Sequence, residues 1–149
     1  MKKAHNKMYP IERSPFRGIS SIHVLARILQ TRPNALTRDS SIYGRYFRSE
    51  VPKNETENRA TQTPYGELRR LHERILNLFS RVDVPEYLHY GIKGRSYVSN
   101  AKAHVGKFET RTIDIEKFFP STTWHHIFTF FSKRLCCADD IAATMASLM

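Results

Sequence analysis

The sequence has few cysteines, no long apolar run and few acidic residues for its length. Only two of its 149 residues are cysteines, Cys136 and Cys137. Neighbouring cysteines rarely pair with each other, so no disulfide framework is indicated. No apolar run approaches the length of a membrane span, and no apolar core follows the basic first residues, as a secretory signal requires. These absences favour a cytoplasmic protein without membrane association.

The shortage of acidic residues leaves the chain strongly basic. It carries 24 Lys and Arg against 14 Asp and Glu, a formal net charge of +10. Residues 1–60 account for +7 of this charge and residues 61–149 for +3. Basic surfaces attract polyanions through phosphate contacts and counterion release. Charge alone does not separate a nucleic-acid partner from an ordinary basic surface, but it makes the N-terminal part the better candidate for such a contact.

The most informative block is TIDIEKFFPS, at residues 112–121. It predicts a short apolar strand that delivers the carboxylate of Asp114, followed at once by a turn with two aromatics. Such a carboxylate can hold Mg²⁺ against substrate phosphates, as in two-metal catalysis of an in-line displacement. Taken alone, an aspartate between a strand and a helix is more often a turn or N-cap residue.

Two blocks upstream change that interpretation. Arg59 precedes a helical pattern that opens at Pro64, and residues 94–104 combine Gly-Arg-Ser with Asn-Ala and His. In this order, the three blocks resemble the fingers and early palm of bacterial reverse transcriptases of the retron and group II intron kind. The resemblance covers roughly residues 45–149.

The resemblance implies an α+β fold with three regions. Residues 1–40 would form a basic N-terminal extension with one helix, residues 41–107 a fingers-like region, and residues 108–149 the first part of a right-hand polymerase palm. The implied activity is RNA-directed DNA polymerisation from deoxynucleoside triphosphates. It would use Mg²⁺ or Mn²⁺, an RNA template or noncoding RNA and a DNA product. A retron-type role in antiviral defence against phage is a further expectation.

The resemblance also assigns roles near the reacting groups. Asp114 would be a metal ligand, and Ile115 would offer its backbone carbonyl to the second ion. Phe119 would lie under the incoming sugar and leave no room for a 2′-hydroxyl. Lys53 and Arg59 would grip the triphosphate, on which charge builds during transfer. Ordinary solvated charges are an equally good interpretation of this last pair.

The middle block would support the template strand and brace the palm through Arg95, Ser96, Asn100 and His104. The last three are spaced by four residues, so on a helix they would share one face. We expect structural or template contacts from them rather than proton transfer.

Two features depart from the family pattern. Thr61 stands where an apolar residue is usual, and the preceding turn is acidic. Cys137-Ala138-Asp139-Asp140 imitates the block with the second catalytic carboxylates, but only 25 residues after Asp114. We interpret Asp139 as a helix N-cap instead.

One aspartate does not complete a two-metal site, so we expect no polymerisation by these residues alone. The alternative is a non-catalytic RNA-binding module or a degenerate remnant.

Apolar periodicity predicts the remaining elements. Helices are expected from Ser20 or Ser21 to about residue 31, then over 64–80, 99–105 and 121–134, and from residue 139 onward; strands are expected over 41–48 and 108–115.

Overall fold

The computed structural model describes residues 8–37, 40–52, 58–115 and 118–149, without the side chain of Phe119. The helices are η1 (Ile11–Arg13), α1 (Ile22–Leu29), η2 (Pro33–Leu36), α2 (Gly66–Phe79), α3 (Tyr97–Ala103), α4 (Phe118–Ser121), α5 (Trp124–Thr129), η3 (Phe130–Arg134) and α6 (Asp139–Leu148). The strands are β1 (Tyr46–Pro52) and β2 (Asn58–Pro64). This mixture agrees with an α+β fold. Within the described ranges β1 and β2 form the only sheet, so the palm stays a prediction.

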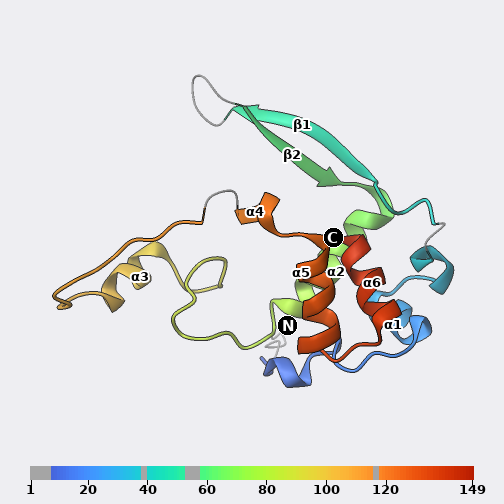
Figure 1. The fold of residues 1–149 in the computed structure, drawn as a ribbon, viewed down its shortest axis with the longest axis horizontal. Coiled ribbons are helices and arrows are strands. Elements are labelled where there is room, and N and C mark those ends of the chain that lie inside the picture. Colours follow the sequence, from blue (N-terminus) through green and yellow to red (C-terminus); the bar gives the residue numbers. More distant parts are fainter. Residues whose placement is uncertain (1–7, 38–39, 53–57, 116–117) are drawn as a thin grey trace, which may run out of the picture.

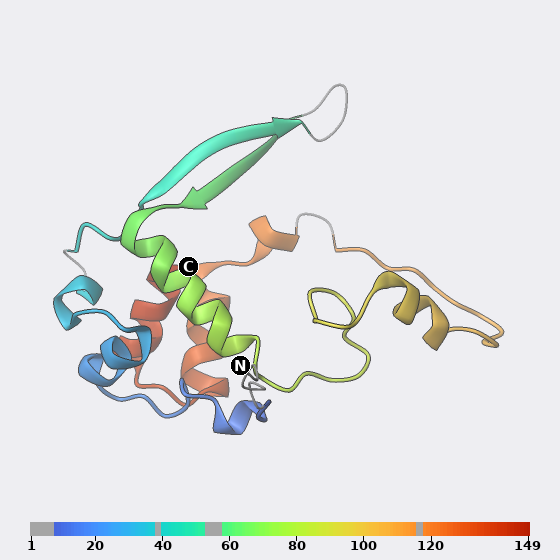
Figure 2. The same ribbon diagram turned by 180° about the vertical axis from the view of Figure 1, so that it is seen from behind.

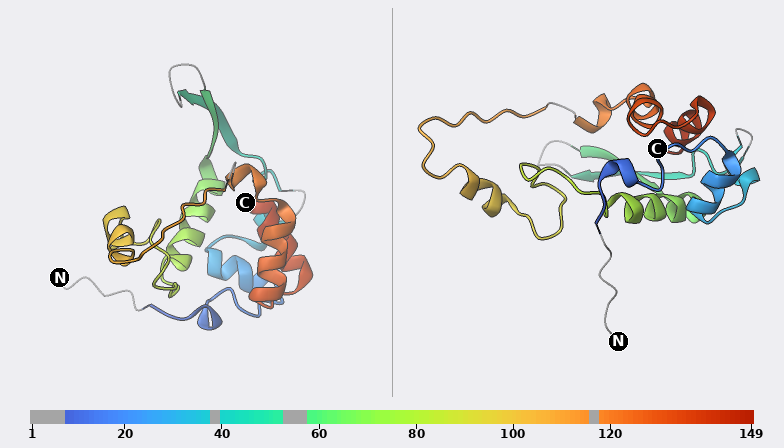
Figure 3. Two further views of the ribbon diagram at one scale, coloured as in Figure 1. Left: turned by 60° about the vertical axis from the view of Figure 1, so that its left-hand side comes forward. Right: turned by 90° about the horizontal axis from the view of Figure 1, so that it is seen from below.

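The elements form three parts (Figure 1). Helices α1, α2, α5 and α6 make a helical core, the β1–β2 hairpin projects from it, and residues 84–115 extend in another direction as an arm that carries α3. Seen from behind, α2 runs from the base of the hairpin to the start of the arm (Figure 2). In the right-hand view of Figure 3, α2 lies in one layer, and α5 and α6 lie in another.

The core forms because helical spacing places apolar side chains on one face of each helix. In α2 the predicted stripe is confirmed, since Leu68, Leu71, Ile75 and Leu78 are all buried. In α1 the predicted cap is also confirmed, because the side chain of Ser21 accepts a hydrogen bond from the backbone N–H of His23. Local sequence therefore specifies these two helices well.

An aromatic cluster joins distant parts of the chain at the centre of this core. The ring of Phe16 stacks on Phe79, with centroids 4.9 Å apart, and meets Phe131 edge-on at 6.1 Å. The backbone N–H of Gly18 donates to the carbonyl of Leu135 at 2.7 Å. Residues from all three expected regions thus contribute to one core.

The hairpin contains no buried residue. Its register pairs Tyr46 with Pro64 and Pro52 with Asn58, and most of its side chains are exposed. The chain passes from β2 into α2 through Gly66, at φ +61°, a conformation that glycine adopts without steric cost. A two-stranded sheet of this kind has little stability by itself, so its packing at the base, through Tyr46, is its link to the core.

Several expected boundaries are wrong. Residues 108–115 form no strand, because no described strand lies beside them to accept their backbone hydrogen bonds. The strand expected at 41–48 begins at Tyr46 instead. The helix expected over 121–134 is divided: α4 ends at Ser121, Thr123 caps α5, and a π-helical turn follows. Asp139 is not the N-cap of α6; Ala138 is, and Asp139 lies in the first turn.

Among the described residues, no helix is both long enough and apolar enough to cross a bilayer.

Candidate functional site

Asp114 lies near the end of the arm, in an irregular segment that leads to α4. Asp114 and the adjoining Ile115 are both exposed. No hydrogen bond or ion pair to another described residue holds the carboxylate. The side chain is therefore accessible to a ligand from solvent, but its position is not set by neighbouring groups.

The other residues expected around the substrate are only partly described. Arg59 lies on β2 opposite Val51, and its side chain is exposed on the hairpin. Phe119 belongs to the short helix α4, but its side chain lies outside the described residues, as does the whole of Lys53. No described contact brings Arg59 together with Asp114, so the proposed triphosphate grip stays a prediction.

Arg95 has a well-defined structural role in the arm. Its Nη1 donates to the carbonyl oxygens of Pro85 and Leu88, both at 2.6 Å, and lies 3.3 Å from that of Glu86. Hydrogen bonds from a charged donor are stronger than neutral ones. The guanidinium therefore holds the 85–88 loop in place, whereas its expected roles in bracing the palm and supporting the template stay predictions.

Helix α3 begins with a reciprocal capping pair. The Oγ of Ser96 accepts from the backbone N–H of Ser99, and the Oγ of Ser99 accepts from that of Ser96. The Nδ1 of His89 lies 2.9 Å from the same Ser99 hydroxyl. Polar contacts, rather than an apolar core, therefore determine the conformation of this part of the arm.

The expected common helix face is only partly formed. Ser96 is the N-cap of α3 and His104 is its C-cap, so these two residues lie at opposite ends of the helix. Asn100 lies within the helix and is exposed. The three residues are near one another along α3, but a seven-residue helix is too short to contain the whole spacing.

A metal site is not complete within the described part of the chain. No group of three or more His, Cys, Asp or Glu side chains is gathered there in a way that could hold a metal ion. Asp114 with the carbonyl of Ile115 is an oxygen donor set of the right chemistry for Mg²⁺. It is too small to hold the ion without further ligands.

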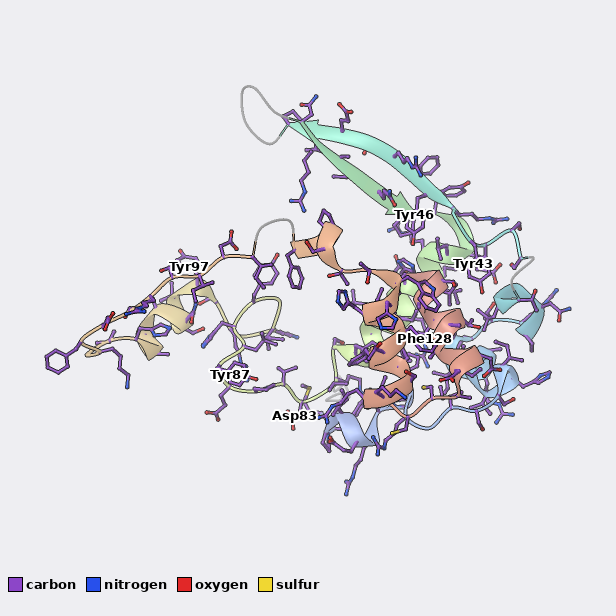
Figure 4. All side chains as sticks on the ribbon, viewed as in Figure 1. Tyr43, Tyr46, Asp83, Tyr87, Tyr97 and Phe128 are labelled. Atoms are coloured by element: carbon purple, nitrogen blue, oxygen red, sulfur yellow. The ribbon has the colours of Figure 1, made fainter. Side chains whose placement is uncertain are left out.

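The aromatic residues of the arm were not singled out from the sequence, and their exposure is seen only in the structure. Tyr87, Tyr90 and Tyr97 are 82–90% exposed, and Phe108 is fully exposed. Figure 4 shows Tyr87 and Tyr97 on the arm, away from the helical core. The signal in the sequence was the alternation of these aromatics with Lys and Arg.

Three retron reverse transcriptases are similar to this chain. The Retron Se72 enzyme of Salmonella heidelberg is 26% identical over 137 residues, which is 91% of this chain and 36% of that protein. The Retron Mx162 and Mx65 enzymes of Myxococcus xanthus are 31% and 32% identical, over 62% and 70% of this chain and 19% and 24% of theirs. No protein-family model matches. The chain thus spans about a third or less of the length of these relatives.

Proposed function

We propose that this chain, a homologue of the retron reverse transcriptases, supplies the fingers and the first catalytic aspartate of an RNA-directed DNA polymerase. The observation that carries the proposal is the motif block around Asp114 in a chain that is similar to named reverse transcriptases. The TIDIEKFFPS block with Asp114 has the residue types that a metal-dependent nucleotidyltransferase requires, and the relatives are named as reverse transcriptases.

The projecting hairpin supports the assignment of the fingers. It carries Arg59 into solvent on a two-stranded sheet, away from the helical core. A guanidinium in that position suits a polyphosphate partner, because it presents fixed donors to phosphate oxygens. In this proposal Lys53 shares that role, and Phe119 selects deoxynucleotides.

Asp114 would be one ligand for Mg²⁺ or Mn²⁺, with the carbonyl of Ile115. The bound ions would stabilise the oxygens between which the phosphoryl group is transferred. Further carboxylates have to come from outside the described residues, so we expect no synthesis from these 149 residues alone. Phage defence and a cytoplasmic location stay predictions.

The test is template-dependent primer extension with Mg²⁺ or Mn²⁺. It compares the protein encoded by the whole reading frame that contains this chain with the 149-residue chain alone. Asp114→Asn is expected to abolish synthesis by the whole protein. The matched control is Glu109→Gln, which removes a carboxylate from the same exposed segment, where its ion pair among the described residues is with Arg111; it is expected to leave synthesis intact.

Synthesis by the Asp114→Asn protein would overturn the catalytic role of Asp114. Synthesis by the 149-residue chain would show that its own groups suffice. Two results together would favour the alternative of a non-catalytic RNA-binding module. The protein from the whole reading frame would show no synthesis, and Asp114→Asn would leave its RNA affinity unchanged.

A further inference from the structure

The arm exposes aromatic rings that its own fold does not use. Tyr87, Tyr90, Tyr97 and Phe108 lie outside the apolar core, and α3 contains no buried residue. Burial of an aromatic ring is worth several times more than a typical surface contact. A single exposed ring is ordinary, but four of them within one segment make the arm the best candidate for a partner contact among the described residues.

The arm is preorganised although its aromatics are exposed. Arg95 holds the carbonyls of the 85–88 loop, next to Tyr87. The Ser96–Ser99 capping pair starts α3 at Tyr97. Because these polar bonds determine the backbone, the rings of Tyr87 and Tyr97 are presented on a defined scaffold, and substituting them leaves its hydrogen bonds in place.

Cations are interleaved with these rings. Residues 85–111 contain five Lys and Arg against two Glu, a net charge of +3. Lys93, Lys102 and Lys107 are all exposed. Stacking platforms flanked by positive charge are the common way in which proteins bind single-stranded nucleic acid, since every base has a face that can stack.

A protein partner fits this surface less well. Lysine is depleted at the centres of protein interfaces, and α3 has the sequence YVSNAKA, without the apolar stripe that a groove-binding helix needs. The core offers a contrast, because an apolar surface that includes Leu76, Phe79, Phe130 and Met149 is lined by one arginine, Arg69, whose charge is paired with Glu73. That surface has the character of a protein contact, and the arm does not.

We propose that the arm, residues 85–111, binds an unpaired RNA strand by stacking its bases on Tyr87, Tyr90, Tyr97 and Phe108. Lys93, Lys102 and Lys107 contact its phosphates. This inference rests on the proposed function for its choice of RNA. It adds a second RNA contact, independent of Asp114, whose selectivity is for unpaired over paired strands rather than for sequence.

The test is fluorescence anisotropy with the 149-residue chain and a labelled, unstructured RNA. The RNA has about 12 nucleotides, within the usual site size of ~4–16 nucleotides. The variant Tyr87→Leu/Tyr90→Leu/Tyr97→Leu is expected to weaken binding by about tenfold or more, because base–aromatic stacking is lost. The matched control Tyr87→Phe/Tyr90→Phe/Tyr97→Phe keeps the rings and is expected to bind like the wild type. Circular dichroism checks that both variants keep the helical core.

Salt dependence separates the rings from the charges. The leucine variant should keep the wild-type slope of log K against log[salt]. Lys93→Gln/Lys102→Gln/Lys107→Gln should lower that slope by about 2, since each phosphate contact with a single strand contributes about 0.7. A blunt RNA duplex should bind equally to the wild type and the leucine variant, because its bases are already stacked.

The stacking site would be overturned if the leucine variant bound the unstructured RNA as tightly as the wild type does. It would also be overturned if the variant lost affinity for the duplex to the same extent as for the single strand. Stronger binding of single-stranded DNA than of RNA would overturn the choice of RNA. Capture of a protein by the arm without any RNA binding would show that the rings form a protein interface. Failure of the proposed function gives a different result: the protein binds unpaired RNA through the rings of the arm, but the primer-extension assay shows no synthesis.

Discussion

The imidazole of His72, on α2, bonds the backbone carbonyl of Leu148 in the last turn of α6, with Nε2 and the oxygen 2.6 Å apart. The hydroxyl of Tyr46, the first residue of β1, donates to the same oxygen at 3.4 Å. The last carbonyls of a helix have no partner within it. The side chains of α2 and of the hairpin base therefore supply what α6 lacks, and they join three parts of the chain.

The first prediction concerns this contact. His72→Leu removes the donor and should lower the free energy of unfolding by about 0.5–1.5 kcal/mol, the usual net value of one hydrogen bond. Urea denaturation followed by circular dichroism measures the change. The control His23→Leu alters an exposed histidine on α1 and should change stability much less. Equal effects of the two substitutions would show that the His72 contact adds no stability.

The second prediction contrasts two phenylalanines. Phe16 is completely buried and Phe108 is fully exposed. Phe16→Ala leaves a cavity beside Phe79 and Phe131, so it should cost about 3–5 kcal/mol. Phe108→Ala should leave the thermal midpoint unchanged. A clear loss of stability in Phe108→Ala would mean that this ring packs against the protein in solution, which would also count against its stacking role.

The third prediction concerns the two neighbouring cysteines. Cys136 is exposed, whereas Cys137 is buried and its thiol donates to the carbonyl of Phe16. Burial raises the pKa of the Cys137 thiol above its ordinary value. With a thiol-specific reagent at neutral pH, Cys136 should react quickly and Cys137 only as the protein unfolds. The variants Cys136→Ser and Cys137→Ser each keep one thiol, so they report the two cysteines separately. Fast modification of Cys137 in the native Cys136→Ser protein would contradict this prediction.

The raised pKa also implies a direction for stability against pH. Because the folded state favours the neutral thiol, the contribution of Cys137 is fully present below the pKa of the unfolded thiol. It is lost as pH rises through the higher pKa of the folded state. Cys137→Ala should flatten this alkaline part of the stability profile relative to the wild type.

The fourth prediction tests the role of Arg95. Arg95→Ala frees the carbonyls of Pro85 and Leu88, so the 85–95 segment should be cleaved faster in limited proteolysis while the core keeps its thermal midpoint. Lys93→Ala, in the same loop, is the control and should not change the cleavage rate. If Arg95→Ala weakens RNA binding without faster cleavage, its guanidinium contacts RNA directly instead of bracing the loop.

Local pattern was a good guide to α1 and α2, in each of which one face is buried. The stripe of Leu68, Leu71, Ile75 and Leu78 and the Ser21 cap are both present in the structure, because spacing and capping act within a few residues. The same reasoning failed at residues 108–115, whose alternating apolar side chains predicted a strand. A strand requires a neighbour for its backbone bonds, and no described segment lies beside this one.

The sequence by itself determined the blocks around Asp114 and residues 94–104, the excess of positive charge and the main helices. These depend on residue type, spacing and composition. Only the tertiary structure decided that Arg95 holds a loop, that His72 reaches the end of α6, and that the aromatics of the arm face solvent. Those outcomes depend on which distant groups meet, because the burial and partners of a side chain are properties of the packed chain and not of its local sequence.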